Sequence, residues 1–131
     1  MKEFMFFIRK QTDSKLSLAP EVHQQFLKSC ETYIDELKQN GRLLSAQPIE
    51  RAGKIIAGKP GDWKETAFNE STEVIGGYYH ILANDLEEAM EIARSNPEFK
   101  FNKDTRIEVR PIKMKEETTG FVYPSLEKTK K

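Results

Sequence analysis

The sequence predicts an α+β fold in which one β-sheet carries two helices on a single face. Two segments, Phe4–Ile8 and Val74–Leu82, are apolar on both faces, which is typical of central strands that are covered on both sides. Segments with apolar residues at helical spacing separate the strands, in the order β-α-β-hairpin-β-α-β. This order and these two strands define the architecture that we expect.

Composition limits the classes of function. A length of 131 residues suits one domain, which we expect at 1–115 with a tail at 116–131. The 21 basic and 21 acidic residues cancel, so neither nucleic acid nor a membrane is an expected partner. Cys30 is the only cysteine, so no internal disulfide or thiolate metal cluster can form. With no apolar run of about 18 residues and no secretory signal at the start, we expect a cytoplasmic protein.

The first helix follows a polar loop that we expect from Arg9 to Ser17. Pro20 suits a first helical position, and Gly41 suits the stop after a helix that runs to about Asn40. The apolar positions span an arc of roughly 140°, which predicts one buried stripe. These positions are Val22, Phe26, Leu27, Cys30, Tyr33, Ile34 and Leu37.

The middle of the chain predicts an edge strand and a hairpin. The segment 42–49 is a diluted strand that contains Pro48, and both features suit a sheet edge. Lys54–Gly58 and the turn at 59–62 predict a hairpin appended to that edge. Trp63 follows this turn, before the central strand.

The second half predicts one more helix and one more strand. We expect the helix to begin at Asn84, with Asn84 as its cap and Glu87 three residues on, and to end before Pro97. A loop is expected from 96 to 105. Arg106–Ile112 then alternates apolar and charged residues, which predicts a strand with one polar face.

The element order matches the split βαβ, or ferredoxin-like, pattern. Right-handed crossovers then place both helices on one face of the sheet. The other face is left with apolar side chains and no helix, which is unusual for a monomer. We therefore predict a homodimer that packs sheet to sheet into an α/β barrel; the alternative is that the C-terminal segment folds back over the sheet.

Strict alternation assigns Ile75, Tyr79 and Ile81 to one face of the central strand, and Val74, Tyr78 and Leu82 to the other. His80 belongs to the second set. Gly76 and Gly77 lack the spacing of a phosphate-binding loop. They indicate a bulge or a close backbone approach instead.

The chain resembles the YCII-related proteins, and within them the DGPF-domain subgroup. The residues that carry the resemblance are Phe4–Ile8, Pro20-Glu21, Gly41-Arg42-Leu43, the stretch 68–79 and Glu108–Ile112. Where the subgroup has Asp-Gly-Pro-Phe, this chain has Glu65-Thr66-Ala67-Phe68, so only Phe68 matches.

This resemblance implies a dimeric α/β barrel of ferredoxin-like subunits and defines function only loosely. Some YCII-like proteins are proposed to be enzymes with a His–Asp pair, and the fold is shared with lactone isomerases, dehydrochlorinases and small monooxygenases. DGPF proteins are also associated with transcription initiation, so a regulatory role is a further alternative.

The candidate catalytic residues are His23, His80, Glu70 and Glu73. His23 falls in the apolar arc of the first helix, and a ring there could transfer protons if it has a partner. A packed or loop-bonded histidine is the alternative at both histidine positions. Glu70 and Glu73 lie where the chain enters the central strand. They are candidates because approach loops often carry functional residues.

The candidate ligand-binding residues are Trp63, Phe68 and Tyr78, which could line a cleft or close the end of a barrel. Two histidines without clustered acids predict no metal site, and we expect no cofactor. The sequence favours a homodimeric domain that binds a small organic ligand. A cofactor-free lyase or isomerase, with a histidine base and a carboxylate, is the main alternative, so enzyme activity stays open.

Overall fold

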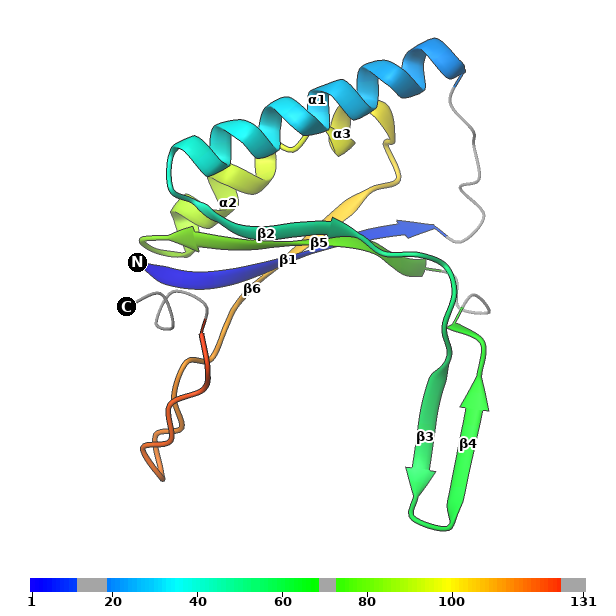
Figure 1. Cartoon of the computed structure of the whole chain (residues 1–131), viewed down its shortest axis with the longest axis vertical. Helices are drawn as coiled ribbons and strands as arrows, with labels where there is room; N and C mark the ends of the chain where they lie inside the picture. The colour runs from blue at the N-terminus through cyan, green and yellow to red at the C-terminus, as the bar shows by residue number, and fades with distance from the viewer. Residues whose placement is uncertain (12–18, 69–72, 126–131) are drawn as a thin grey trace.

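A computed structural model describes residues 1–11, 19–68 and 73–125 of the chain (Figure 1). Four strands form one antiparallel sheet in the order β2-β5-β1-β6. Their bounds are β1 Lys2–Gln11, β2 Leu43–Pro48, β5 Glu73–Ala83 and β6 Arg106–Pro111. The central strands are β5 and β1, so the predicted α+β, ferredoxin-like topology is confirmed.

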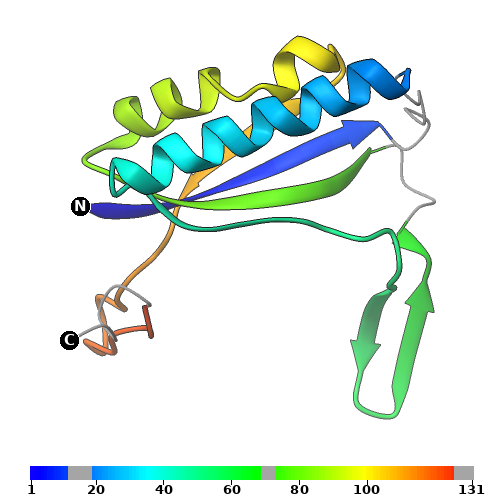
Figure 2. The ribbon, with the colours of Figure 1, turned by 45° about the horizontal axis from the view of Figure 1, so that its top comes forward.

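All helices lie on one face of this sheet (Figures 1 and 2). They are α1 Pro20–Gln39, α2 Leu86–Arg94 and α3 Glu98–Phe101. The core forms between them and the sheet, from alternate residues of the central strands and from the buried sides of α1 and α2. Its members are Phe4, Phe6, Ile8, Tyr33, Leu37, Tyr79, Ile81, Ala83, Ala89 and Ala93. We call the other side of the sheet the open face.

A β-bulge changes which side chains of β5 reach the open face. Ile8 pairs with Gly77 but Arg9 pairs with Ile75, so Gly76 is an extra residue in β5. The predicted bulge is confirmed, and the predicted faces of Ile75 and Val74 are wrong. One inserted residue reverses the alternation, so Ile75 shares the open face with Tyr78. Val74 is buried and pairs with Lys10, whose Nζ forms an ion pair with Glu98 of α3 on the helix side.

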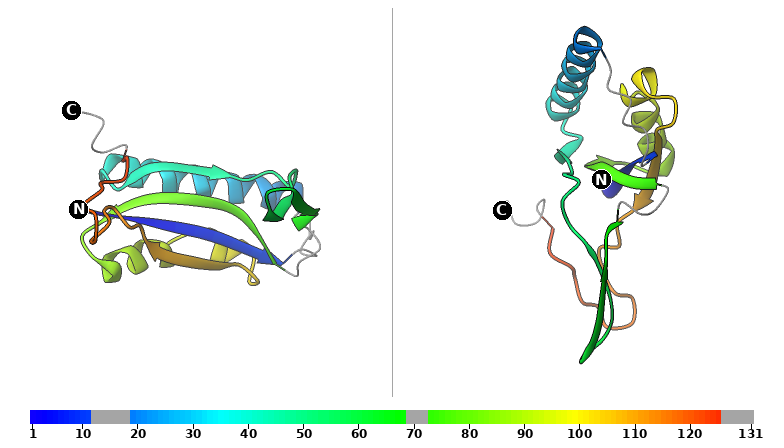
Figure 3. Two further views of the ribbon diagram at one scale, coloured as in Figure 1. Left: turned by 90° about the horizontal axis from the view of Figure 1, so that it is seen from below. Right: turned by 90° about the vertical axis from the view of Figure 1, so that its right-hand side faces the viewer.

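The hairpin is a separate two-stranded sheet of β3, Ile55–Lys59, and β4, Asp62–Thr66. The sequence predicts a hairpin appended to the edge of the sheet; the hairpin follows the edge strand β2, and within the described residues it pairs with no strand of the main sheet. It extends away from the sheet on the side opposite the helices (Figures 1 and 3). Trp63, expected after the hairpin, lies within β4 and is exposed.

Three element boundaries differ from those predicted. Strand β1 continues through Gln11, because its polar end still pairs with β5. The cap of α2 is Asp85 and not Asn84, since the backbone N–H of Glu88 donates to Oδ1 of Asp85 at 2.9 Å. The short helix α3 lies in the segment predicted to be a loop.

The segment 113–125 lies on the open side of the sheet, at the end opposite the hairpin (Figure 1). Its connection begins where the N–H of Ile112 donates to the carbonyl of Glu3 at 2.9 Å. The hydroxyl of Ser125 then donates to Oε2 of the same glutamate. The alternative to a dimer predicts that the C-terminal segment folds back over the sheet; in the structure this segment contacts one end of the open face, at Glu3. Within the described residues, no helix is long and apolar enough to span a membrane.

Candidate functional site

The open face carries a cavity of about 540 Å³ beside the base of the hairpin. Its floor comes from Met5 and Phe7 of β1 and from Ile75 and Tyr78 of β5. Its wall comes from the segments that lead into and out of the hairpin, and includes Ile49, Ala52, Gly53, Ile55 and Phe68. Aromatic and aliphatic groups dominate the lining, as in most sites for small organic molecules.

A histidine–carboxylate pair lies on the same face. Nε2 of His80 is 2.7 Å from Oε1 of Glu3, and Glu3 also accepts a hydrogen bond from Ser125. The Glu3 side chain is only 3% exposed, so both oxygens are satisfied by these neighbours and not by bulk water. Because a carboxylate accepts, the ring donates from Nε2, and Nδ1 of a neutral ring is left as an acceptor.

Strand register links this pair to the cavity. Met5 of β1, a cavity residue, pairs directly with His80 of β5. Tyr78, another cavity residue, precedes His80 by two positions on the same face, a separation of about 7 Å. The imidazole therefore lies beside the cavity, although it is not part of the lining.

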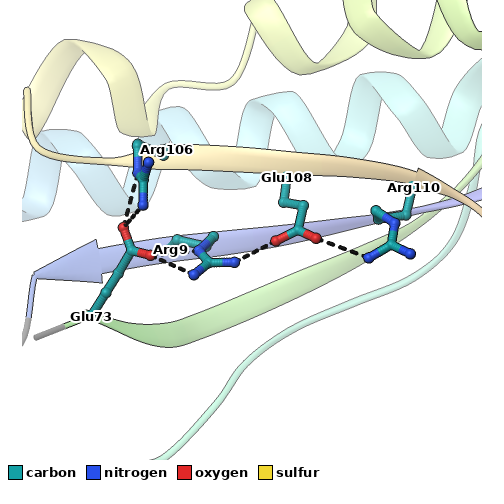
Figure 4. Close-up of polar contacts among 5 residues, drawn as sticks. All are labelled: Arg9, Glu73, Arg106, Glu108 and Arg110. Carbon is teal, nitrogen blue, oxygen red and sulfur yellow. Dashed lines mark hydrogen bonds and ion pairs between the residues drawn. The ribbon is translucent and has the colours of Figure 1, made fainter. Parts of the chain in front are cut away.

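A chain of alternating charges crosses the same face at its β6 side (Figure 4). Glu73 accepts from Nε of Arg9 at 2.6 Å and from Nε of Arg106 at 2.9 Å. Arg9 also donates to Glu108 at 2.5 Å, and Glu108 accepts from Arg110 at 3.1 Å. Three arginines thus surround two glutamates.

These contacts set the ionisation of the network. Hydrogen bonds from Arg106 and Arg9 hold the pKa of Glu73 below its ordinary value. Those from Arg9 and Arg110 do the same to the pKa of Glu108. Both glutamates are therefore charged and engaged at neutral pH, which makes Glu73 a structural ion-pair partner and a poor proton acceptor.

The structure brings together only some of the residues nominated from sequence. Phe68, Tyr78 and Glu73 line one cavity, and His80 lies beside it. His23 lies in the exposed first turns of α1, where its ring faces Phe26 at 6.4 Å between centroids, so it does not reach the sheet. Trp63 is outside the cavity lining. Glu70 lies outside the described residues.

Sequence reasoning missed Glu3, the carboxylate partner of His80. One signal could have found it. The two central strands of this topology run antiparallel, which brings the start of Phe4–Ile8 beside the end of the strand that carries His80. Ser125 gave no such signal, because it follows an irregular segment. Among the described residues, no group of three or more His, Cys, Asp or Glu could hold a metal ion.

Comparisons with known proteins agree with this architecture. The family model of the YCII-related domain matches residues 4–114. No protein with a curated description matches the sequence. Among solved structures, the chain is similar to the 5-chloro-2-hydroxyhydroquinone dehydrochlorinase of Burkholderia phenoliruptrix AC1100, in complex with 2,5-dihydroxybenzoquinone. The TM-score is 0.53 and the identity 17%, over 85% of this chain and 93% of the other, so this likeness concerns the fold alone.

Proposed function

The chain belongs to the YCII-related family, and from this premise we propose that it forms a homodimer that binds a small, planar organic molecule in the open-face cavity. The observation that carries the proposal is the cavity itself. Aromatic side chains of Phe7, Phe68 and Tyr78 line it, and aromatic walls suit flat rings. The similar dehydrochlorinase structure holds such a ring, 2,5-dihydroxybenzoquinone.

The uncovered apolar surface of the open face supports the proposed dimer. Ile75 is 43% exposed, and Met5, Phe7 and Tyr78 are only half-buried on the same face. A second copy related by a twofold axis would cover this face with the same face of its own. The hairpin and the segment 113–125 lie at opposite ends of this face (Figure 1). Light scattering at micromolar concentration should give twice the mass of one chain.

Ligand binding is tested by thermal unfolding with 2,5-dihydroxybenzoquinone as the probe. At a hundredfold excess over its Kd, a ligand adds about 2.7 kcal/mol to the stability of the folded state. We expect the probe to raise the midpoint temperature of thermal unfolding of the wild-type protein by several degrees. Ile75→Trp fills the cavity floor and should abolish the rise.

The matched control is Leu86→Trp, which makes the same kind of substitution at an exposed position on α2. This variant should respond as wild type does. The proposal fails if Ile75→Trp responds like wild type, or if a panel of quinones and phenols leaves every midpoint unchanged.

A cofactor-free acid–base enzyme is the second candidate, and the His80–Glu3 pair favours it. Nδ1 of His80 has no hydrogen-bond partner among the described residues, so it could accept a proton from a ligand that extends past Met5. Glu3, held by Ser125, would orient the ring and stabilise its charged form. Return of the proton to another atom gives isomerisation. Departure of an anion from the adjacent carbon gives elimination.

Deuterium exchange separates this enzyme from a simple binding protein. A ligand found by the thermal assay is incubated with the protein in D2O and followed by NMR. An enzyme of this kind exchanges a ligand C–H, His80→Asn stops the exchange without loss of binding, and Glu3→Gln slows it. Exchange that is equal in His80→Asn and wild type would refute the acid–base role while leaving ligand binding intact.

A further inference from the structure

Exposed apolar side chains gather on two projections that flank the open face. One is the hairpin of β3 and β4, and the other is the segment 113–125 at the opposite end of the sheet (Figure 1). Every residue of both hairpin strands is exposed. Because a two-stranded ribbon is only marginally stable in water, a hairpin with both faces exposed indicates that another surface covers it in the assembled protein.

The segment 113–125 also directs aromatic rings toward solvent. Phe121 is more than half exposed, and its ring meets that of Tyr123 edge to face, with the centroids 5.1 Å apart. A backbone bridge between Lys115 and Val122 ties the two sides of this turn together. The aromatic pair is therefore presented on a folded turn, at the edge of the open face, and is not buried by its own chain.

The exposed apolar surface matches what a stable interface needs. Among the described residues, eight large apolar side chains on the open face and its two projections are 37% to 63% exposed. They are Ile49, Ile55, Ile56, Trp63, Ile75, Phe121, Val122 and Tyr123. At about 150–250 Å² for a large side chain, these fractions leave roughly 700 Å² of apolar surface on each copy. A stable interface takes about 800 Å² from each partner.

The reach of the hairpin limits how a second copy can fit. Sheets that pack face to face lie about 10 Å apart. Each hairpin strand has five residues and spans about 17 Å. The hairpin extends away from the open face (Figures 1 and 3). It is thus longer than the space between two packed sheets, and in a sheet-to-sheet dimer it must run along the end of the partner's sheet.

Two twofold arrangements bring the open faces together. In one, the hairpins lie at the same end of the dimer, and each brings its charged turn, with Lys59 and Asp62, to the apolar cavity of the other copy. In the second, the ends are exchanged, and each cavity meets the segment 113–125 of the other copy. The second arrangement is favoured, because charged groups are costly to desolvate and aromatic rings are not.

We propose that two copies pack open face to open face with their ends exchanged, so that the partner's Phe121 and the partner's Tyr123 roof the open-face cavity. Trp63 of the hairpin then packs beside the partner's segment 113–125. The inference rests on the homodimer and the ligand of the proposed function, and adds that each binding site is built from two chains. One chain supplies the floor and one wall of the cavity, and its partner supplies the roof.

Mixed dimers test whether two chains share the site. Ile75→Trp blocks the floor of its own cavity, and Phe121→Ala removes the roof from the cavity of its partner. Each variant alone should lose binding of 2,5-dihydroxybenzoquinone at wild-type affinity, measured by calorimetry. After subunit exchange of an equal mixture, random pairing leaves about one quarter of all cavities intact, and these should bind as wild type does. Phe99→Ala, at an exposed position on α3, is the matched control and should bind normally.

A photo-cross-link shows the arrangement without any ligand. The photoreactive residue p-benzoylphenylalanine replaces Trp63 in one preparation, which exchanges subunits with a wild-type preparation labelled with heavy nitrogen. Trypsin releases the peptide 116–128, which contains Phe121 and Tyr123, and the peptide 55–64 of the hairpin. We expect the photoreactive hairpin to be joined to the heavy peptide 116–128.

The outcomes separate this inference from the proposed function. Wild-type binding without recovery in the mixture overturns the shared site and leaves the proposed ligand intact. A cross-link to the heavy peptide 55–64 overturns the exchange of ends, and so does a dimer without any cross-link to the heavy chain. A monomer in light scattering, or wild type that binds no quinone or phenol, overturns the proposed function itself.

Discussion

The two faces of one sheet differ in how the same strands are used. On the helix side, alternate residues of β1 and β5 are almost fully buried, with Phe6 and Ile81 at 0% exposure. On the open face, their neighbours Phe7 and Tyr78 border a cavity, and charged groups lie beside them. The helix side therefore supplies the stability of the fold. The side chains of the open face are less constrained by packing.

The largest expected effect comes from adjacent phenylalanines on opposite faces. Phe6→Ala removes a ring from the core and should cost about 3–5 kcal/mol of unfolding free energy. Phe7→Ala should cost roughly 1 kcal/mol in the isolated chain, because its ring is only half-buried. Urea unfolding at low protein concentration measures both. Equal losses would contradict the division between the two faces.

The next effect concerns the two glycines of β5. A Cβ on Gly77 would lie 3.0 Å from the backbone carbonyl oxygen of Gln47, which cannot move without disturbing β2. Gly77→Ala should therefore cost about 1–3 kcal/mol. A Cβ on Gly76 meets the flexible Lys10 side chain at 3.3 Å, so Gly76→Ala is the milder matched control. The comparison fails if Gly76→Ala is the more damaging change in a thermal melt.

Acid should weaken the open face through its charge network. The pKa values of Glu73 and Glu108 are lowered from 4.5 by their arginine partners. Their contribution to stability is therefore complete above that value and is lost as pH falls through the lower pKa of the folded state. Urea midpoints from pH 7 to pH 3 should fall for wild type and fall less for the double variant Glu73→Gln, Glu108→Gln. Parallel curves would show that the network adds nothing.

The smallest effect is expected on the helix side, at the exposed pair of Arg94 with Glu91. Such pairs contribute about 0.2–0.5 kcal/mol, because solvent screens them. Arg94→Gln should therefore shift the midpoint temperature of thermal unfolding only slightly. Added salt should remove the difference between this variant and wild type. If Arg94→Gln loses as much stability as the variant of the open-face network, the difference between the two sets of charges does not depend on the face on which they lie.

Most of the fold could be predicted from local patterns. The apolar segments around Phe6 and Ile81 and the stripe on α1 identify the central strands and the helix side, because burial imposes the periods of strands and helices. The glycine pair indicates a bulge near Gly76, but the sequence does not show how many residues the bulge inserts into the strand. A single extra residue reverses the faces of the residues before it, and strict alternation therefore places Ile75 on the wrong side.

The candidate site was less accessible to sequence reasoning, because it depends on pairing between distant segments. His80 meets Glu3 across 77 positions of the chain, and Ser125 reaches the same carboxylate across 122. Nothing local in either segment indicates the other. His23 shows the opposite error, since its place in the apolar arc suggested burial, but the first turns of α1 extend past the point where the helix contacts the sheet.

The hairpin of β3 and β4 holds the only tryptophan of the chain, and Trp63 is 57% exposed at a distance from the core. Intrinsic emission from this indole reports on the hairpin and its surroundings. A denaturation curve recorded by tryptophan fluorescence would follow detachment or fraying of the hairpin. Melting of the body between sheet and helices would register instead in the near-ultraviolet signal of Tyr33 and Tyr79, so the two optical probes can be used to observe the two parts separately.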